Sequence, residues 1–121
     1  MLVLSAALGL SGCGVILIGG AAAGTVGYVN GELTSTLEST YEQVVAAADR
    51  AIVENSIHEV SKTTEAYQAS YVLRTPQGDK IQINIAYKTR KLTEVSIRVG
   101  IFGVESLSRQ ILNEIESRLN N

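Results

Sequence analysis

The chain of 121 residues has few of the residue types that carry covalent cross-links and much enzyme chemistry. It contains one cysteine, one histidine, one proline and no tryptophan, and no charged residue precedes Glu32. A single cysteine excludes an intrachain disulfide, so the stability of a folded domain has to come from packing. A single histidine excludes sites built on two histidines and argues against a zinc enzyme.

The charged residues that are present nearly balance, with a net charge of −2, and are unevenly distributed. Residues 31–65 carry seven acids and two bases, whereas residues 66–103 carry six bases and two acids. A net charge close to zero argues against nucleic acid as a partner. The basic middle block is therefore the part of the chain to examine for a surface that meets an anionic partner.

The only cysteine lies directly behind an uncharged apolar run at residues 1–9, at the end of the tetrapeptide Leu10-Ser11-Gly12-Cys13. This arrangement resembles the lipobox of bacterial lipoprotein precursors, in which the thiol accepts an acyl group. The resemblance implies a diacylglyceryl thioether on Cys13 and cleavage before it, so that residues 1–12 are a signal peptide. Because such a peptide normally begins with positive charge, we expect this one to be incomplete at its N-terminus. The alternative for Cys13 is a small buried apolar side chain.

Residues 13–30 follow as an uncharged, glycine-rich apolar stretch, with small residues at Gly19, Ala23, Gly27 and Gly31. This four-residue spacing lets membrane helices approach closely. The apolar run of sixteen residues at 14–29 is nevertheless shorter than the ~20 residues that span a bilayer. Two interpretations stay open, a flexible tether between lipid and domain and a pair of membrane helices.

Residues 31–121 are predicted to form one α+β domain behind this tether. Alternating apolar residues predict strands near 67–74, 81–87 and 93–99, with turns at 75–79 and 89–91, and a weaker strand at 57–62. The segment 28–38 also alternates and is predicted as a strand, although Val29, Leu33 and Leu37 would align on a helix too. Apolar stripes predict helices at 40–55, with Ser39 as N-cap and Glu42 three residues on, and at 105–120.

The expected architecture is a small antiparallel sheet of three to five strands with two amphipathic helices packed on one face, in the order β-α-β-β-β-α. The opposite face would then be polar, with Arg74, Lys88 and Arg98 as candidate binding residues. Their partners would be anionic lipid, glycan or an envelope protein. The alternative is an ordinary solvated sheet face without a partner.

The search for catalytic motifs finds none that is complete. His58-Glu59 lacks the second histidine of the H-E-x-x-H zinc motif, and no G-x-S-x-G motif is present. We therefore expect no enzyme activity, no metal and no cofactor.

Three further segments are short and apolar but occur in a characteristic order, at 27–33, 95–103 and 106–112. Together with the lipobox and the glycine-rich stretch, this pattern resembles the bacterial lipoproteins grouped as domain of unknown function 3568. The resemblance implies an envelope lipoprotein of a Gram-negative bacterium and supplies no catalytic residues. Gly14 stands where an Asp resembles an inner-membrane retention signal, which implies an outer-membrane protein facing the periplasm.

The expected function is that of a membrane-anchored structural or interaction module of the envelope. The alternative is a periplasmic lipoprotein that binds a small apolar or anionic ligand. A pocket of several hundred cubic ångströms between sheet and helices would favour the ligand-binding protein, and a filled core would favour the module.

Overall fold

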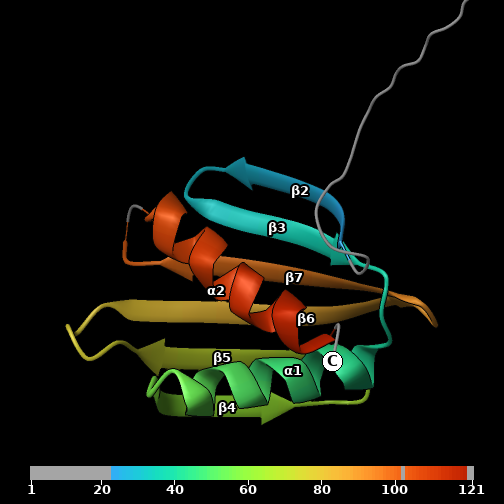
Figure 1. Cartoon of the computed structure of the whole chain (residues 1–121), viewed down its shortest axis with the longest axis horizontal. Helices are drawn as coiled ribbons and strands as arrows, with labels where there is room; N and C mark the ends of the chain where they lie inside the picture. Colours follow the sequence, from blue (N-terminus) through green and yellow to red (C-terminus); the bar gives the residue numbers. More distant parts are fainter. Residues whose placement is uncertain (1–22, 102, 120–121) are drawn as a thin grey trace, which may run out of the picture.

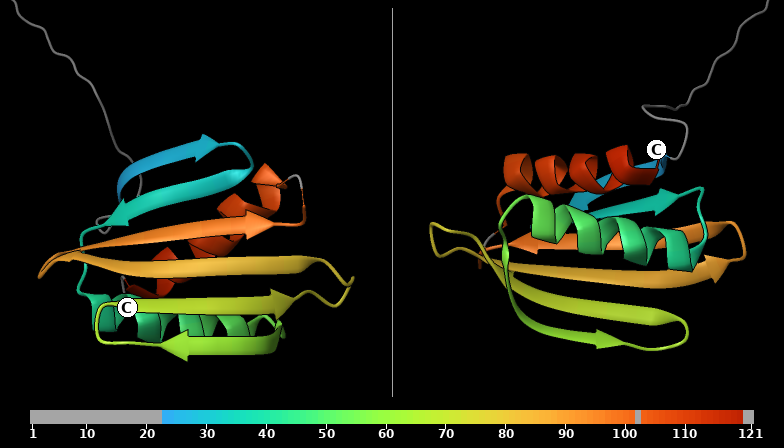
Figure 2. Two further views of the ribbon diagram at one scale, coloured as in Figure 1. Left: turned by 180° about the vertical axis from the view of Figure 1, so that it is seen from behind. Right: turned by 60° about the horizontal axis from the view of Figure 1, so that its bottom comes forward.

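The computed structural model describes residues 23–101 and 103–119. In these residues a six-stranded antiparallel sheet carries two helices on one face and leaves the other face uncovered (Figures 1 and 2). The elements in chain order are β2 (Ala23–Val29), β3 (Glu32–Leu37), α1 (Tyr41–Glu54), β4 (His58–Thr64), β5 (Gln68–Arg74), β6 (Lys80–Thr89), β7 (Leu92–Val99) and α2 (Glu105–Leu119). Their order across the sheet is β2-β3-β7-β6-β5-β4. The predicted α+β class with both helices on one face is confirmed.

Period-two alternation separates the two faces of the sheet. Ile83 of β6 lies opposite Tyr71 of β5 and Ile97 of β7, and all three side chains are buried beneath the helices. Asn84, the next residue of β6, points to the uncovered face and is exposed. A one-residue slip would exchange these two faces, so burial of the isoleucines holds the register.

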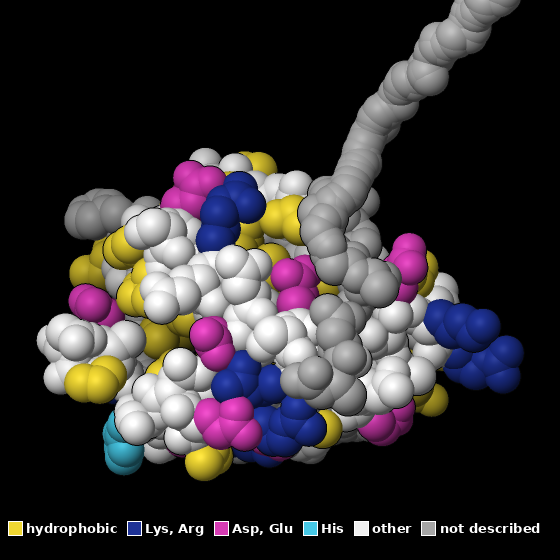
Figure 3. All heavy atoms as spheres, in the orientation of Figure 1, with side chains coloured by type: hydrophobic (Ala, Val, Ile, Leu, Met, Phe, Trp, Pro, Cys, Tyr) yellow, Lys and Arg dark blue, Asp and Glu magenta, His cyan; other side chains and the backbone are white. Residues whose placement is uncertain are grey.

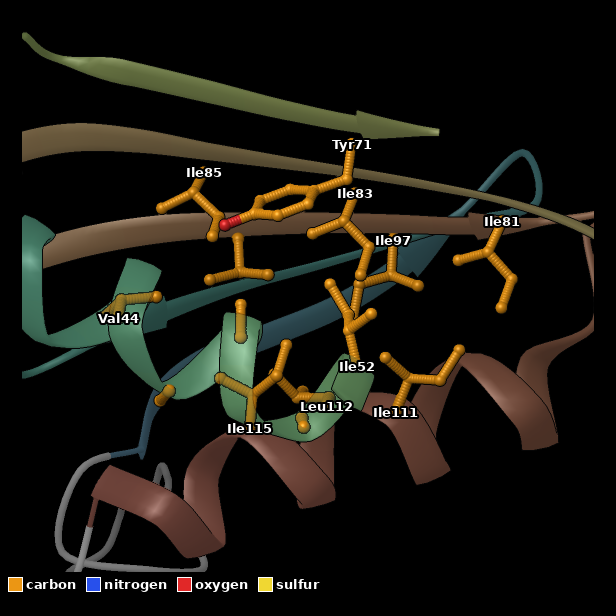
Figure 4. Close-up of a cluster of buried hydrophobic side chains, with 14 of the residues drawn as sticks. Val44, Ile52, Tyr71, Ile81, Ile83, Ile85, Ile97, Ile111, Leu112 and Ile115 are labelled. Atoms are coloured by element: carbon orange, nitrogen blue, oxygen red, sulfur yellow. The ribbon is translucent and has the colours of Figure 1, made fainter. Parts of the chain in front are cut away.

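The helices contribute the second half of the core. Val44 and Ile52 of α1 and Ile111, Leu112 and Ile115 of α2 belong to the same buried cluster as the isoleucines of the sheet (Figure 4). Both helices were predicted from their apolar stripes, and the stripes are the sides that face the sheet.

The N-cap of α1 is Thr40, one residue after the predicted Ser39. Thr40 Oγ1 accepts a hydrogen bond from the Gln43 amide, and Gln43 Oε1 accepts one from the Thr40 amide, which makes a complete capping box. The carbonyl of Ser39 instead accepts a hydrogen bond of 2.8 Å from Thr93 Oγ1. This contact ties the start of α1 to β7, which local sequence could not reveal.

The segment 28–38 is extended as predicted rather than helical, but a tight turn divides it into two strands, so the prediction of one continuous strand is wrong. Asn30 and Gly31 have φ values of 53° and 83°, so they form a two-residue hairpin turn between β2 and β3. Asn-Gly is the preferred pair for such a turn because both residues tolerate positive φ. The signal was present in the sequence, but the uncharged, glycine-rich residues before it resemble a tether.

The sheet consequently has six strands rather than three to five. β2 consists of residues 23–29, which the sequence predicts as part of the tether, so the folded part begins before residue 31. The weak strand predicted at 57–62 is present as β4, with an irregular register between Glu59 and Ser61. Such a bulge on an edge strand disfavours pairing with another chain.

The link from β7 to α2 packs against the new hairpin. Gly103 has a φ of 85°, and a Cβ there would overlap the backbone of Gly31 and approach the Tyr28 hydroxyl. Ile101 in the same link is 85% exposed. Phe102, in the same link, lies outside the described residues.

Candidate functional site

The uncovered face of the sheet is the surface on which the sequence placed its candidate binding residues (Figure 2, left). It is mostly polar and includes both acids and bases, as the alternation on the four central strands shows. The outward residues of these strands are Glu32, Thr34, Thr36, Gln68, Ser70, Val72, Arg74, Lys80, Gln82, Asn84, Ala86, Lys88, Leu92, Glu94, Ser96 and Arg98. Four bases stand against two acids, so the face is weakly basic.

Arg74, Lys80 and Arg98 lie together at one end of this face, and we call them the basic corner. Arg74 pairs with Lys80 across β5 and β6, and Arg98 lies on the next strand, opposite Gln82. Arg74 donates a hydrogen bond of 3.0 Å to the Gly78 carbonyl, and Arg98 donates one of 3.0 Å to the Asn30 carbonyl. The basic corner is thus held against two turns.

Lys88 lies at the opposite end of the sheet, in the hairpin between β6 and β7. We call Lys88, Arg90 and Lys91 the hairpin tip. Eight residues along β6 separate Lys80 from Lys88, which corresponds to about 26 Å in an extended strand. The structure therefore brings Arg74 and Arg98 into one region and places the third predicted residue, Lys88, far from both.

Acids accompany both groups of bases. Glu32 pairs with Arg98 across β3 and β7. Lys88 Nζ lies 3.5 Å from Glu94 Oε1, and Lys91 shares a shallow hollow with Glu38. Exposed ion pairs of this kind contribute about 0–1 kcal/mol to folding stability, so another anion can replace the carboxylate at little cost.

A polar cluster missed by the sequence analysis lies at the rim of the core, where β5 and β4 meet α1. The Tyr71 hydroxyl donates a hydrogen bond of 2.9 Å to Asp49 Oδ1, and Lys62 Nζ lies 2.9 Å from the same oxygen. Burial, followed by this hydrogen bond, raises the pKa of Tyr71 well above its usual range. The phenol therefore stays neutral and serves packing rather than acid–base chemistry.

A second polar cluster joins the two helices. Arg118 Nε donates a hydrogen bond of 2.9 Å to Glu54 Oε1, and Arg118 Nη1 donates one of 2.8 Å to Glu114 Oε1. Asn55 Nδ2 also donates a hydrogen bond to Glu114 Oε1, and the bonds from Asn55 and Arg118 lower the pKa of the Glu114 carboxyl. The i,i+4 spacing of Glu114 and Arg118 is the sequence signal for this pair.

A cleft of about 160 Å³ opens between α1, α2 and the turn at 75–79. Its apolar wall is formed by core residues such as Ile52, Ile81 and Ile111, whereas Gln77, Gln110 and Glu114 line its polar part. The volume is below the ~300–1,000 Å³ of most small-molecule sites.

His58 and the lipobox residues are the other residues that the sequence analysis considered. His58 is exposed on β4 opposite Arg74, and the described residues contain no cluster of three histidine, cysteine or acidic side chains fit to hold a metal. Within the described ranges, neither helix has the length and apolar character needed to cross a membrane. Cys13 and the other lipobox residues Leu10, Ser11 and Gly12 lie outside the described residues.

A family model described as "Protein of unknown function (DUF3568)" matches residues 1–118, which is nearly the whole chain. No curated protein matches the sequence.

Proposed function

We propose that this chain, which belongs to the DUF3568 family of proteins of unknown function, is a lipid-anchored interaction module of the bacterial cell envelope. Cys13 would carry the lipid, and the sheet domain would present its uncovered face to an envelope partner. The protein would reside in the outer membrane and face the periplasm.

The observation that carries the proposal is the asymmetry of the two-layer domain. Both helices cover one face of the sheet, and no other described residue covers the opposite face of the six strands. Bases outnumber acids on that face, and three of them form the basic corner. An uncovered face with a local excess of positive charge is suited to an anionic surface or partner.

The lipobox supports the anchor, and the start of β2 supports a short connection to it. Ala23, the first residue of β2, follows Cys13 by ten residues, which span at most about 35 Å when fully extended. An anchored domain would thus stay close to the membrane surface. Stable attachment needs more than one acyl chain, which the diacylglyceryl group would supply.

Acyl labelling of Cys13 in cells tests the anchor. We expect the wild type to incorporate labelled palmitate and to fractionate with membranes, and Cys13→Ser to lose both properties. Cys13→Ser removes only the thiol that would accept the acyl group, so loss of labelling would report on the lipid. Palmitate label on the variant, or a wild type found only in the soluble fraction, would contradict the proposal.

Density-gradient fractionation tests the destination. We expect the wild type with outer-membrane markers, and Gly14→Asp with inner-membrane markers. A wild type that fractionates with the inner membrane would overturn the outer-membrane part of the proposal and leave the anchor intact.

Binding to purified envelope glycan tests the basic corner. The full chain carrying Cys13→Ser should sediment with the glycan at low salt and be released as salt rises, since exposed charges are screened within ~8 Å at physiological salt. Adding Arg74→Gln, Lys80→Gln and Arg98→Gln should abolish sedimentation. Equal binding by the two proteins would assign the contact to another surface.

The cleft favours a second candidate function, the binding of a small apolar group. Its volume of about 160 Å³ is similar to the ~150 Å³ of dry cavities known to bind benzene. Saturating benzene should then raise the melting temperature of the full chain. The variant Ala51→Leu, which fills one wall of the cleft, should remove this increase; no increase in the wild type would eliminate the candidate.

A further inference from the structure

The end of the sheet at which β2 begins also carries the hairpin tip. Ala23 pairs with Leu37, Leu37 with Thr93, and Thr93 with Tyr87. The Tyr87 amide in turn donates a hydrogen bond of 2.9 Å to the Tyr67 carbonyl. This row crosses β2, β3, β7 and β6 and reaches Tyr67, which lies directly before β5. Lys88 directly follows Tyr87, so the start of β2 and the hairpin tip lie at the same end (Figure 1).

Two exposed tyrosines belong to the same row. Tyr67 is 67% exposed and Tyr87 is 37% exposed, and their rings meet edge to face with centroids 5.1 Å apart. Neither ring fills the core, although both are large enough to do so. A tyrosine with an apolar ring and a hydroxyl suits the boundary between water and lipid, where such residues are enriched.

The hairpin tip forms the outermost part of this end. The hairpin extends beyond the first turn of α1 (Figure 1), and Lys and Arg side chains project there (Figure 3). Acids are nearby, since Glu94 pairs with Lys88 and Glu38 shares a hollow with Lys91. Two more, Glu42 and Glu65, lie near the start of α1. The positive charge is therefore local to the projecting tip.

A lipid on Cys13 would bring this end to the membrane. β2 and β6 are separated by three strand spacings, or about 14 Å, which is less than the ~35 Å that ten extended residues can span. The basic corner lies about 26 Å farther along β6. The connection can thus place the hairpin tip on the bilayer, with the basic corner directed away from it.

We propose that the hairpin tip, flanked by Tyr67 and Tyr87, contacts anionic phospholipid headgroups of the membrane that holds Cys13. This inference rests on the proposed lipid anchor and adds an orientation to it. Cations attract the headgroups, and the tyrosine rings settle at the interface. The strands then run away from the bilayer, and the basic corner, at the end of the sheet far from the membrane, is available to a partner.

The test anchors the chain by chemistry rather than by cellular processing. Because Cys13 is the only cysteine, the full chain can be coupled through it to a maleimide phospholipid in lipid nanodiscs. Amide hydrogen exchange is then compared between discs of phosphatidylcholine alone and discs with about one-third phosphatidylglycerol. We expect the amides of residues 88–92 to exchange at least about threefold more slowly on the anionic discs, and those of the turn at 75–79 to be unchanged.

Two variants that remove the same number of charges provide the control. The tip variant (Lys88→Gln, Arg90→Gln, Lys91→Gln) should lose the added protection, and the corner variant (Arg74→Gln, Lys80→Gln, Arg98→Gln) should retain it. Equal exchange of the wild-type tip on both discs would overturn the inference, as would protection at 75–79 instead or equal loss in the two variants. Failure of acyl labelling in cells would instead overturn the anchor, because the nanodisc result does not depend on it.

Discussion

The two faces of the sheet have the same backbone and differ in almost everything else. On β6, Ile81, Ile83 and Ile85 are buried, whereas the intervening Gln82 and Asn84 are exposed. The helix-covered face has few polar groups: the Thr93 hydroxyl donates a hydrogen bond, whereas the Ser35 hydroxyl has no partner among the described residues. The uncovered face accepts charges of both signs with little effect on stability. Side-chain changes should therefore act strongly on one face and weakly on the other.

The largest expected effect comes from introducing a carboxylate on each face at neighbouring positions. Ile83→Asp should unfold the domain, because an unpaired buried carboxylate costs several kcal/mol against a total stability of about 5–10 kcal/mol. Asn84→Asp should melt close to the wild type. Thermal unfolding followed by circular dichroism compares them, and equal melting temperatures would show that the register is wrong.

A smaller effect is expected from the tyrosine hydroxyl at the rim of the core. Tyr71→Phe removes the hydrogen bond to Asp49 and should cost about 1 kcal/mol at neutral pH. Tyr67→Phe, at an exposed ring without such a bond among the described contacts, should cost almost nothing. Urea unfolding measures the free energy of unfolding of both variants. Equal stability of Tyr71→Phe and Tyr67→Phe would contradict a structural role for the Tyr71 hydroxyl.

The same hydroxyl predicts a dependence on alkaline pH. Tyrosine in the unfolded chain titrates near 10, and burial raises the pKa of Tyr71 above that value. Its contribution to stability is therefore complete below about pH 10 and is lost as pH rises toward the folded-state pKa. Above about pH 10 the wild type should lose stability more steeply than Tyr71→Phe; parallel pH curves would contradict this assignment.

Ser35 on the covered face should show a still smaller change of opposite sign. Its hydroxyl is buried and has no hydrogen-bond partner among the described residues. Ser35→Ala should be neutral or stabilising by up to about 1 kcal/mol, because it removes the cost of burying an unpaired polar group. Ser96→Ala, on the uncovered face, is the matched control and should be neutral. A clear loss of stability in Ser35→Ala alone would reveal a partner for the hydroxyl.

The smallest effect is expected from the three predicted binding residues. Replacing Arg74, Lys88 and Arg98 with Gln should change stability by no more than about 0.5 kcal/mol each, because their contacts are exposed or only partly buried. The melting temperature measures this directly. A large decrease would mean that these side chains hold the fold, and binding data from the variants would then need reinterpretation.

The sequence was sufficient for the strands β5, β6 and β7 and for both helices. In each of these elements the apolar period is uninterrupted, and each lies where one side is buried. It was insufficient for β2, whose residues lack charge and include two glycines, so that their composition favoured a tether. The N-cap lies one residue after the predicted one because Ser39 and Thr40 both offer a hydroxyl, and Thr40 forms the capping box with Gln43.

The sequence predicted which face of the sheet carries the candidate binding residues, but not how these residues are arranged on that face. Alternation placed Arg74, Lys88 and Arg98 on the uncovered side, because side-chain direction in a strand is a local property. Their separation into the basic corner and a distant hairpin tip follows from strand length and pairing. The salt-bridged Arg118 and the Tyr71–Asp49 contact depend on segments far apart in the chain.

By itself, the sequence determined which residues alternate, which helix sides are apolar and where the lipobox-like motif stands, since each depends on neighbours along the chain. Tertiary structure decided that β3 lies between β2 and β7, and thereby that the start of β2 shares an end of the sheet with the hairpin tip. Strand order is set by burying the most apolar surface under two helices, a sum over the whole domain. The apolar surface buried over the whole domain cannot be derived from any local sequence pattern, so only the folded chain shows how the basic residues are arranged.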